Sequence, residues 1–184
     1  MLLAAAAHAQ TVLPANLADR VKICLGCHGE GGRSTQPGTP SLAGQPKLFL
    51  ENRLVLIREG LSVVDQMKGL LELFNDAELT ALAGYFAAQS PPPASVPRDA
   101  TRAERGRHIA ERALCGSCHL PDQRGRDQMP RLATQREDYL LATLRAMLAG
   151  KATGRDTAMT NALGGMSDRD LSDLAHHLAT MNTP

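Results

Sequence analysis

The feature that most constrains this chain is a duplication, because one pattern is written twice in 184 residues. The segment Cys24–His28 (Cys-Leu-Gly-Cys-His) returns 91 residues later as Cys115–His119 (Cys-Gly-Ser-Cys-His). The segment Pro40–Gln45 returns as Pro130–Gln135 at an offset of 90, and the last part of each half keeps this register at an offset of 92. Self-similarity at a nearly constant offset predicts two copies of one small domain.

The division of the chain follows from this repeat. We predict an N-terminal domain over residues 10–90 and a C-terminal domain over residues 99–184, joined by a Pro-rich linker over residues 91–98. Three consecutive prolines, Pro91–Pro93, favour a stiff and extended connection over a flexible one. The linker therefore predicts two domains held in a fixed mutual orientation.

Residues 1–9 are interpreted as the remnant of a signal peptide. An apolar run ends in Ala7-His8-Ala9, a small-x-small cleavage pattern that predicts a mature start at Gln10. An Ala-rich tail without a targeting role is the alternative. Elsewhere no apolar run approaches the 18 or so residues that span a bilayer. The net charge of +1 gives no case for a nucleic-acid partner.

Each half is predicted to consist of short helices joined by loops. In the first half, one helix runs from about Leu17 into the Cys motif, and a second runs from near Pro46 to Gly60. Capping patterns predict further helix starts at Asn75-x-x-Glu78, Thr101-x-x-Glu104 and Ser167-x-x-Asp170. No segment alternates as a strand would, so the predicted class is all-α with two tandem domains.

The Cys motifs carry the chemistry. Cys-x-x-Cys-His is the attachment signature of c-type haem: on a helical turn, cysteines three apart point the same way and can bond the two vinyl groups on one porphyrin edge. The adjacent His then places an imidazole nitrogen on iron. With 3% aromatic residues and no Trp, each small domain also needs such an apolar staple. We predict two covalently bound haem c groups, held by Cys24, Cys27 and His28 and by Cys115, Cys118 and His119.

Three other uses of the cysteines compete with haem. A zinc site is disfavoured because 88 residues separate the two pairs and a His follows each pair. A thioredoxin-like redox pair would need a βαβ context, which is absent from the sequence. Disulfides within each pair would close only a tiny loop and add little stability. No cysteine lies outside the two motifs.

The sixth iron ligand decides what such a haem can do. An iron held by His and Met is coordinatively saturated and exchanges electrons without binding substrate. In the first half Met67, 39 residues after His28, is the predicted ligand, with a Lys ligand or an open site as alternatives. In the second half the repeat selects Met159. The competitors there are Met129, Met147, Met166, Met181, His108, His176 and His177. We assign Met147 and Met166 to the core, and we assign His176 and His177 to the surface or to packing at a haem edge.

Groups around the ligands are predicted as well. The ring N–H of His28 needs an acceptor, and the carbonyl of Pro40 is the candidate, with Pro130 serving His119. Arginines cluster around the second loop, where they could neutralise haem propionates, dock an acidic partner or form a solvated basic loop. They are Arg124, Arg126, Arg131 and Arg136.

These motifs resemble the dihaem cytochrome c4 family, built from two class I cytochrome c domains. The resemblance rests on both Cys motifs, on Pro40–Gln45, and on the segments Met67–Phe86 and Met159–Leu178. It implies two domains related by a pseudo-twofold axis, haems facing each other across it, and the ligand pairs already predicted. It also implies a periplasmic protein, loosely at the membrane, between a respiratory complex or dehydrogenase and a terminal oxidase.

Two departures make the halves unequal. Thr134 stands where the first half has Gly44, and His177 stands where the first half has Tyr85.

The predicted function is electron transfer between redox proteins, without a small-molecule substrate and without catalysis. The alternative is a dihaem subunit of a dehydrogenase complex, such as a flavocytochrome c sulfide dehydrogenase, whose catalytic chemistry belongs to a partner. A third hypothesis, that the chain is itself a peroxidase or thiosulfate-oxidising enzyme, needs an open iron site or a spare Cys ligand. The sequence offers no spare Cys.

Overall fold

The computed structural model describes residues 15–181, so the predicted signal remnant and the mature start at Gln10 lie outside the described residues. The described residues contain helices and loops but no strand, which confirms the all-α class. None of these helices is long and apolar enough to cross a membrane. The helices are α1 (Ala15–Ala18), α2 (Val21–His28), α3 (Lys47–Arg58), α4 (Asp76–Ala87), α5 (Ala100–Arg112), α6 (Cys115–His119), α7 (Glu137–Leu148), α8 (Thr157–Ala162) and α9 (Asp168–Ala179), with 3₁₀ turns η1 (Glu30–Gly32) and η2 (Asp65–Met67).

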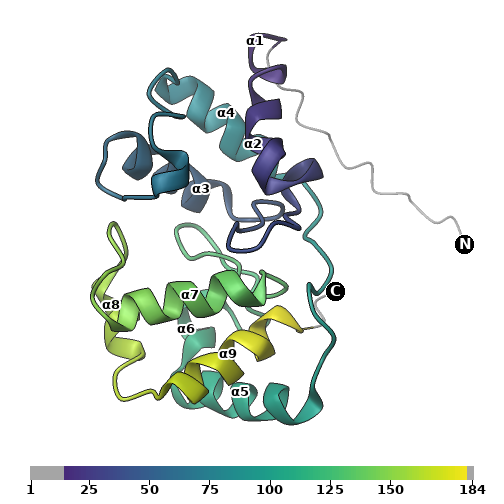
Figure 1. The fold of residues 1–184 in the computed structure, drawn as a ribbon, viewed down its shortest axis with the longest axis vertical. Helices are drawn as coiled ribbons and strands as arrows, with labels where there is room; N and C mark the ends of the chain where they lie inside the picture. The colour runs from purple at the N-terminus through teal and green to yellow at the C-terminus, as the bar shows by residue number, and fades with distance from the viewer. Residues whose placement is uncertain (1–14, 182–184) are drawn as a thin grey trace, which may run out of the picture.

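The helices form two stacked units, α1–α4 and α5–α9, and the chain between α4 and α5 runs along one side from one unit to the other (Figure 1). Each unit has its own apolar core. The first joins Leu17 and Val21 to a buried face of α4, and the second joins Ile109 of α5 to a buried face of α9. The buried faces include Leu79, Leu82, Ala83 and Phe86 in α4 and Leu171, Leu174 and Leu178 in α9.

Two of the three predicted helix starts are confirmed. The Asn75 and Ser167 side chains accept from the backbone N–H three residues on, and complete capping boxes. The prediction for Thr101 was wrong, because α5 begins at Ala100 with Asp99 as its cap. The Asp99 carboxylate accepts from two backbone N–H groups, at 2.9 and 3.0 Å, and so fixes the start two residues earlier.

The first helix of the N-terminal unit also differs from its prediction. The expected continuous helix breaks at Asp19 and Arg20 into α1 and α2. The Arg20 guanidinium pairs with Glu78 of α4 at 2.6 Å and lies 3.7 Å from the centroid of the Phe74 ring. These tertiary contacts hold the break against α4. The following helix, α3, begins at Lys47 with Pro46 as its N-cap, and Gly60 lies just beyond its end.

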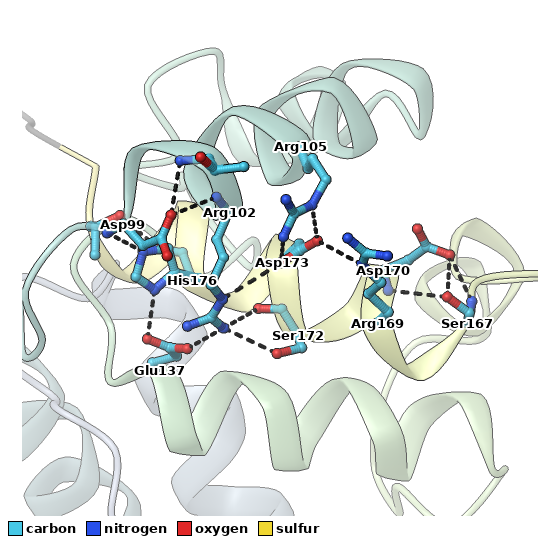
Figure 2. A network of polar contacts seen from close by, with 12 residues as sticks. Asp99, Arg102, Arg105, Glu137, Ser167, Arg169, Asp170, Ser172, Asp173 and His176 are labelled. Atoms are coloured by element: carbon cyan, nitrogen blue, oxygen red, sulfur yellow. Dashed lines mark hydrogen bonds and ion pairs between the residues drawn. The ribbon is translucent and has the colours of Figure 1, made fainter.

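A polar network joins α5, α7 and α9 in the C-terminal unit (Figure 2). Asp173 of α9 is 4% exposed and accepts from Arg105 of α5 at 2.6 and 3.0 Å. His176, which was predicted to lie on the surface or at a haem edge, is instead 2% exposed. Its Nδ1 bonds the Glu137 carboxylate at 2.9 Å and its Nε2 accepts from the Asp99 N–H at 2.9 Å. The surface prediction for His176 was wrong because partners on two other segments satisfy both ring nitrogens.

Candidate haem-binding sites

The two Cys motifs lie at equivalent places, at the C-terminal end of α2 and over the whole of α6. In each motif the first cysteine is half-buried and the second is exposed. Burial raises the pKa of the Cys24 and Cys115 thiols. None of the four cysteines forms a disulfide, so all four thiols are free to bond a ligand.

The two histidines of the motifs are buried and held in the same way. His28 is 7% exposed and His119 is 3% exposed. The Nδ1–H of His28 donates to the Pro40 carbonyl at 2.8 Å, and that of His119 donates to the Pro130 carbonyl at 2.8 Å. These contacts confirm the predicted acceptors. Burial lowers the pKa of both imidazoles, so the neutral ring with its proton on Nδ1 is favoured.

A neutral imidazole protonated at Nδ1 presents a lone pair at Nε2, which is the form that ligates metals. In the second site the buried Nε2 of His119 has no hydrogen-bond partner. Such an orphaned buried nitrogen is uncommon in folded proteins. Together with the free thiols one helical turn away, it fits a covalently attached porphyrin whose iron takes this nitrogen.

A metal site built from protein side chains alone is not supported. Among residues 15–181, no three or more His, Cys, Asp and Glu side chains gather where they could hold a metal ion. The zinc alternative would require the four cysteines, or two with both histidines, to converge. The two motifs instead belong to separate units (Figure 1).

The loop after each motif positions the proline by the same fold-back. In the first unit, the N–H groups of Leu42 and Ala43 donate to the Gly32 carbonyl at 2.7 and 3.2 Å. In the second unit, those of Leu132 and Ala133 donate to the carbonyl of Gln123 at 2.8 and 3.1 Å. This turn holds the preceding proline carbonyl over the imidazole.

The predicted methionine ligands occupy different local structures. Met67 ends the 3₁₀ turn η2, whereas Met159 lies inside the short helix α8. Each is partly buried against the core of its own unit. Met147, predicted as core, is 6% exposed on α7, and Met166 also packs against the second core. His176 is excluded as a ligand because both of its ring nitrogens are already bonded.

The arginines of the second loop do not act as one cluster. Arg131 is 8% exposed, and its Nε donates to the Ala133 carbonyl at 3.1 Å. Arg136 forms a two-bond ion pair with Asp138, at 3.0 Å for both contacts. The exposed Arg124 lies 3.6 Å from Asp122. Only part of this loop is therefore the solvated basic segment considered above.

Sequence reasoning missed a reciprocal contact between the units, made by the glutamine that ends each Pro-x-Leu-Ala-x-Gln stretch. Gln45 and Gln135 are each 5% exposed. The Gln45 amide bonds the backbone of Arg131 in both directions, and the Gln135 amide does the same with Ser41. A buried polar residue repeated at one position was the available signal. The exchange of equivalent contacts is what a pseudo-twofold axis requires.

Known proteins are similar to this chain in sequence and in fold. A family model described as "Cytochrome c" matches residues 103–182. Cytochrome c4 of Pseudomonas aeruginosa is 30% identical over 168 residues, which cover 86% of this chain and 84% of that protein. The crystal structure of reduced cytochrome c4 from Pseudomonas stutzeri superposes with a TM-score of 0.84 at 26% identity, and the match covers 93% of this chain and 100% of that one. The chain belongs to the cytochrome c4 family.

Membership of the cytochrome c4 family defines the cofactors and the broad role. The chain carries two covalently bound haem c groups, one for each tandem domain, and is an electron carrier rather than an enzyme. Another relative is the "Thiosulfate dehydrogenase electron acceptor" of Thiomonas intermedia, which is 30% identical over 168 residues covering 85% of this chain and 77% of that protein.

Proposed function

We propose that this cytochrome transfers single electrons in the periplasm, between a respiratory donor and a terminal oxidase or other acceptor. In this proposal one iron is held by His28 and Met67 and the other by His119 and Met159. A haem iron in that environment supplies a reversible one-electron couple with no open position for a substrate. The residues of the chain orient the ligands and exclude water.

The observation that carries the proposal is the matched geometry of the two histidines. Each buried ring uses its Nδ1–H on a proline carbonyl at 2.8 Å, which fixes the ring orientation and leaves Nε2 for iron. The buried core histidine His176, by contrast, bonds through both of its ring nitrogens. The partly buried Met67 and Met159, in register in the two halves, are the corresponding sulfur donors.

The ligand assignment is tested by the weak far-red absorption band that a thioether–ferric iron bond produces. Met67→Leu and Met159→Leu keep the side-chain volume nearly constant while removing sulfur. We expect each to remove about half of the band and the double variant to remove all of it, with two haems still attached. Met147→Leu, at a buried core position, is the matched control and should leave the band intact. A full band in both ligand variants would contradict the assignment.

A second role is favoured by one comparison. The Thiomonas relative is named as the electron acceptor of a thiosulfate dehydrogenase, which suits a carrier paired with, or bound to, a dehydrogenase. The two roles are separated by purifying the tagged cytochrome from periplasmic and membrane fractions at low and moderate salt. If a dehydrogenase stays bound to the tagged cytochrome at moderate salt, the cytochrome acts as a subunit of that enzyme. If every redox protein dissociates from it, the cytochrome acts as a free electron carrier.

A further inference from the structure

Each unit contributes one buried glutamine, whose amide makes two hydrogen bonds to the loop that holds the histidine of the other unit. The Arg131 N–H donates to Gln45 Oε1 at 3.0 Å, and the Ser41 N–H donates to Gln135 Oε1 at 2.8 Å. The amide orientation follows from its partners, because Gln45 Nε2 also donates to the Arg131 carbonyl at 2.9 Å. All of these bonds lie in the buried contact between the units.

The peptide groups whose N–H donates to the two glutamines also accept hydrogen bonds from the proposed iron-ligating histidines. The Arg131 N–H and the Pro130 carbonyl belong to a single peptide unit, and that carbonyl accepts from His119 Nδ1. Likewise, the Ser41 N–H and the Pro40 carbonyl form the peptide that accepts from His28. Each chain of bonds thus runs from a glutamine oxygen in one unit, through one peptide, to a histidine in the other.

Hydrogen bonds in series strengthen one another, because an N–H that donates polarises its peptide and makes the carbonyl a better acceptor. A better acceptor at Nδ1 makes the imidazole a more basic ligand and favours the ferric state of the iron that it holds. We propose that Gln45 and Gln135 are positioning residues that lower the reduction potential of the haem in the opposite domain, through the Pro130–Arg131 and Pro40–Ser41 peptides. This inference rests on the proposed function, since it takes His119 and His28 as the iron ligands.

The two bridges are unequal for a reason visible in the sequence. Gln135 Oε1 also accepts from the N–H of the next residue, Arg136, at 2.9 Å, so it divides its acceptor strength between two donors. The residue after Gln45 is Pro46, which has no N–H. Gln45 therefore directs its oxygen to Arg131 alone, and we expect the stronger effect at the haem beside His119.

The test replaces each glutamine by leucine in the haem-loaded protein and measures both reduction potentials by a redox titration followed by NMR. The haem resonances are assigned domain by domain from contacts within each domain. Gln45→Leu should favour reduction of the haem beside His119 about two- to threefold, a change of about a tenth of the strength of a hydrogen bond in an apolar interior, and leave the other haem unchanged. Gln135→Leu should act on the haem beside His28, and less strongly.

Thr153→Val is the control. The Thr153 hydroxyl accepts from the Val63 N–H across the same interface at 2.8 Å, away from the Pro40–Ser41 and Pro130–Arg131 peptides. The variant should leave both potentials unchanged. Shifts in the domain that carries the substitution, equal shifts in both domains, or none would overturn the inference. The haem content is measured in the same samples. If two haems are attached and titrate reversibly, but the potential of the haem in the opposite domain does not change, only this inference is overturned. If haem is missing, the proposed function is overturned.

A measurement without substitution covers the case in which the variants fail to fold. In the loaded parent protein, the amide hydrogens of Ser41 and Arg131 should exchange with solvent at least a hundredfold more slowly than that of the exposed loop residue Thr35, because both are bonded and buried. Exchange at the rate of an exposed loop would show that the bridges are not formed and would overturn the inference.

Discussion

The two units share one pattern but stabilise the contact between their first and last helices by different means. In the C-terminal unit the long helix α5 crosses α9 so closely that a Cβ on Gly106 would lie 2.1 Å from the Asp173 carbonyl oxygen. In the N-terminal unit the helix is broken, and the Arg20–Glu78 pair and Leu17 hold it to α4. Side-chain bridges from Arg105 to Asp173 accompany the close approach in the C-terminal unit, so the two units differ in whether the helix backbones meet closely.

The polar content of the last helix differs in the same way. Asp173 and His176 of α9 correspond, in the register of the repeat, to Ala81 and Gly84 of α4. The C-terminal unit buries these polar side chains and satisfies them, Asp173 with Arg105 and His176 with Glu137 and the Asp99 N–H. The N-terminal unit has small residues at these places. Buried charged groups are retained at low cost only when their partners are present. The second unit thus depends on a complete network where the first depends on packing.

The largest expected effect is at the α5–α9 crossing. Gly106→Ala should lower the free energy of unfolding by about 3 kcal/mol, because the new methyl group meets backbone that cannot move aside without separating the helices. Thr101→Ala, exposed in the first turn of the same helix, is the control and should change it by less than about 0.5 kcal/mol. Chemical denaturation of both variants measures the difference, and equal stabilities would mean that the crossing is looser than described.

A second comparison places threonine at Gly44 in one variant and glycine at Thr134 in another. Both have positive φ, +68° and +60°, and both donate their N–H to the last helix of their own unit. The linker passes over Gly44, where a Cβ would lie 2.6 Å from Pro91. Gly44→Thr should therefore destabilise by about 2 to 3 kcal/mol, through strain and overlap together.

The reverse change, Thr134→Gly, removes a strained β-branched residue at no steric cost, so it should be neutral or stabilise by up to about 1 kcal/mol. Thermal unfolding of the two single variants gives the contrast. Similar losses in both would show that the linker does not distinguish the two positions.

A smaller effect is expected at the buried histidine. His176→Leu leaves the Asp99 N–H without its acceptor and should lower the free energy of unfolding by about 2 kcal/mol. His108→Leu, on the exposed face of α5, is the control and should change it by less than about 0.5 kcal/mol. If the two variants unfold alike in denaturant, the network does not support the C-terminal unit.

The smallest effect concerns pH. Hydrogen bonding and charge from Arg105, opposed by burial, hold the pKa of Asp173 below its ordinary value. A carboxyl whose folded pKa is depressed stabilises the protein above its unfolded pKa of about 4, and this stability is lost as pH falls through the folded value. Asp173→Asn should thus cost about 1 kcal/mol at pH 7 and much less at pH 3. Denaturation at the two pH values measures this, and a loss independent of pH would assign the effect to packing.

The sequence by itself determined the local features of this cytochrome. The two Cys motifs, the apolar faces of α4 and α9, and the caps at Asn75 and Ser167 depend on residues a few positions apart, where helical periodicity and backbone hydrogen bonding determine the structure. The duplication was visible because the same motifs recur in the same order. The proline acceptors for His28 and His119 were also predictable, because the repeat places a proline 12 residues after the first histidine and 11 residues after the second.

Only the tertiary structure decided which side chains meet across long separations. His176 looked like a surface residue because its partners, Glu137 and the Asp99 N–H, come from a different helix and from the end of the linker. The glutamine bridges join residues in different halves of the chain, and no local pattern specifies a partner at that distance. Burial makes every such polar group require a bond, but the packing of the two units determines which group supplies it.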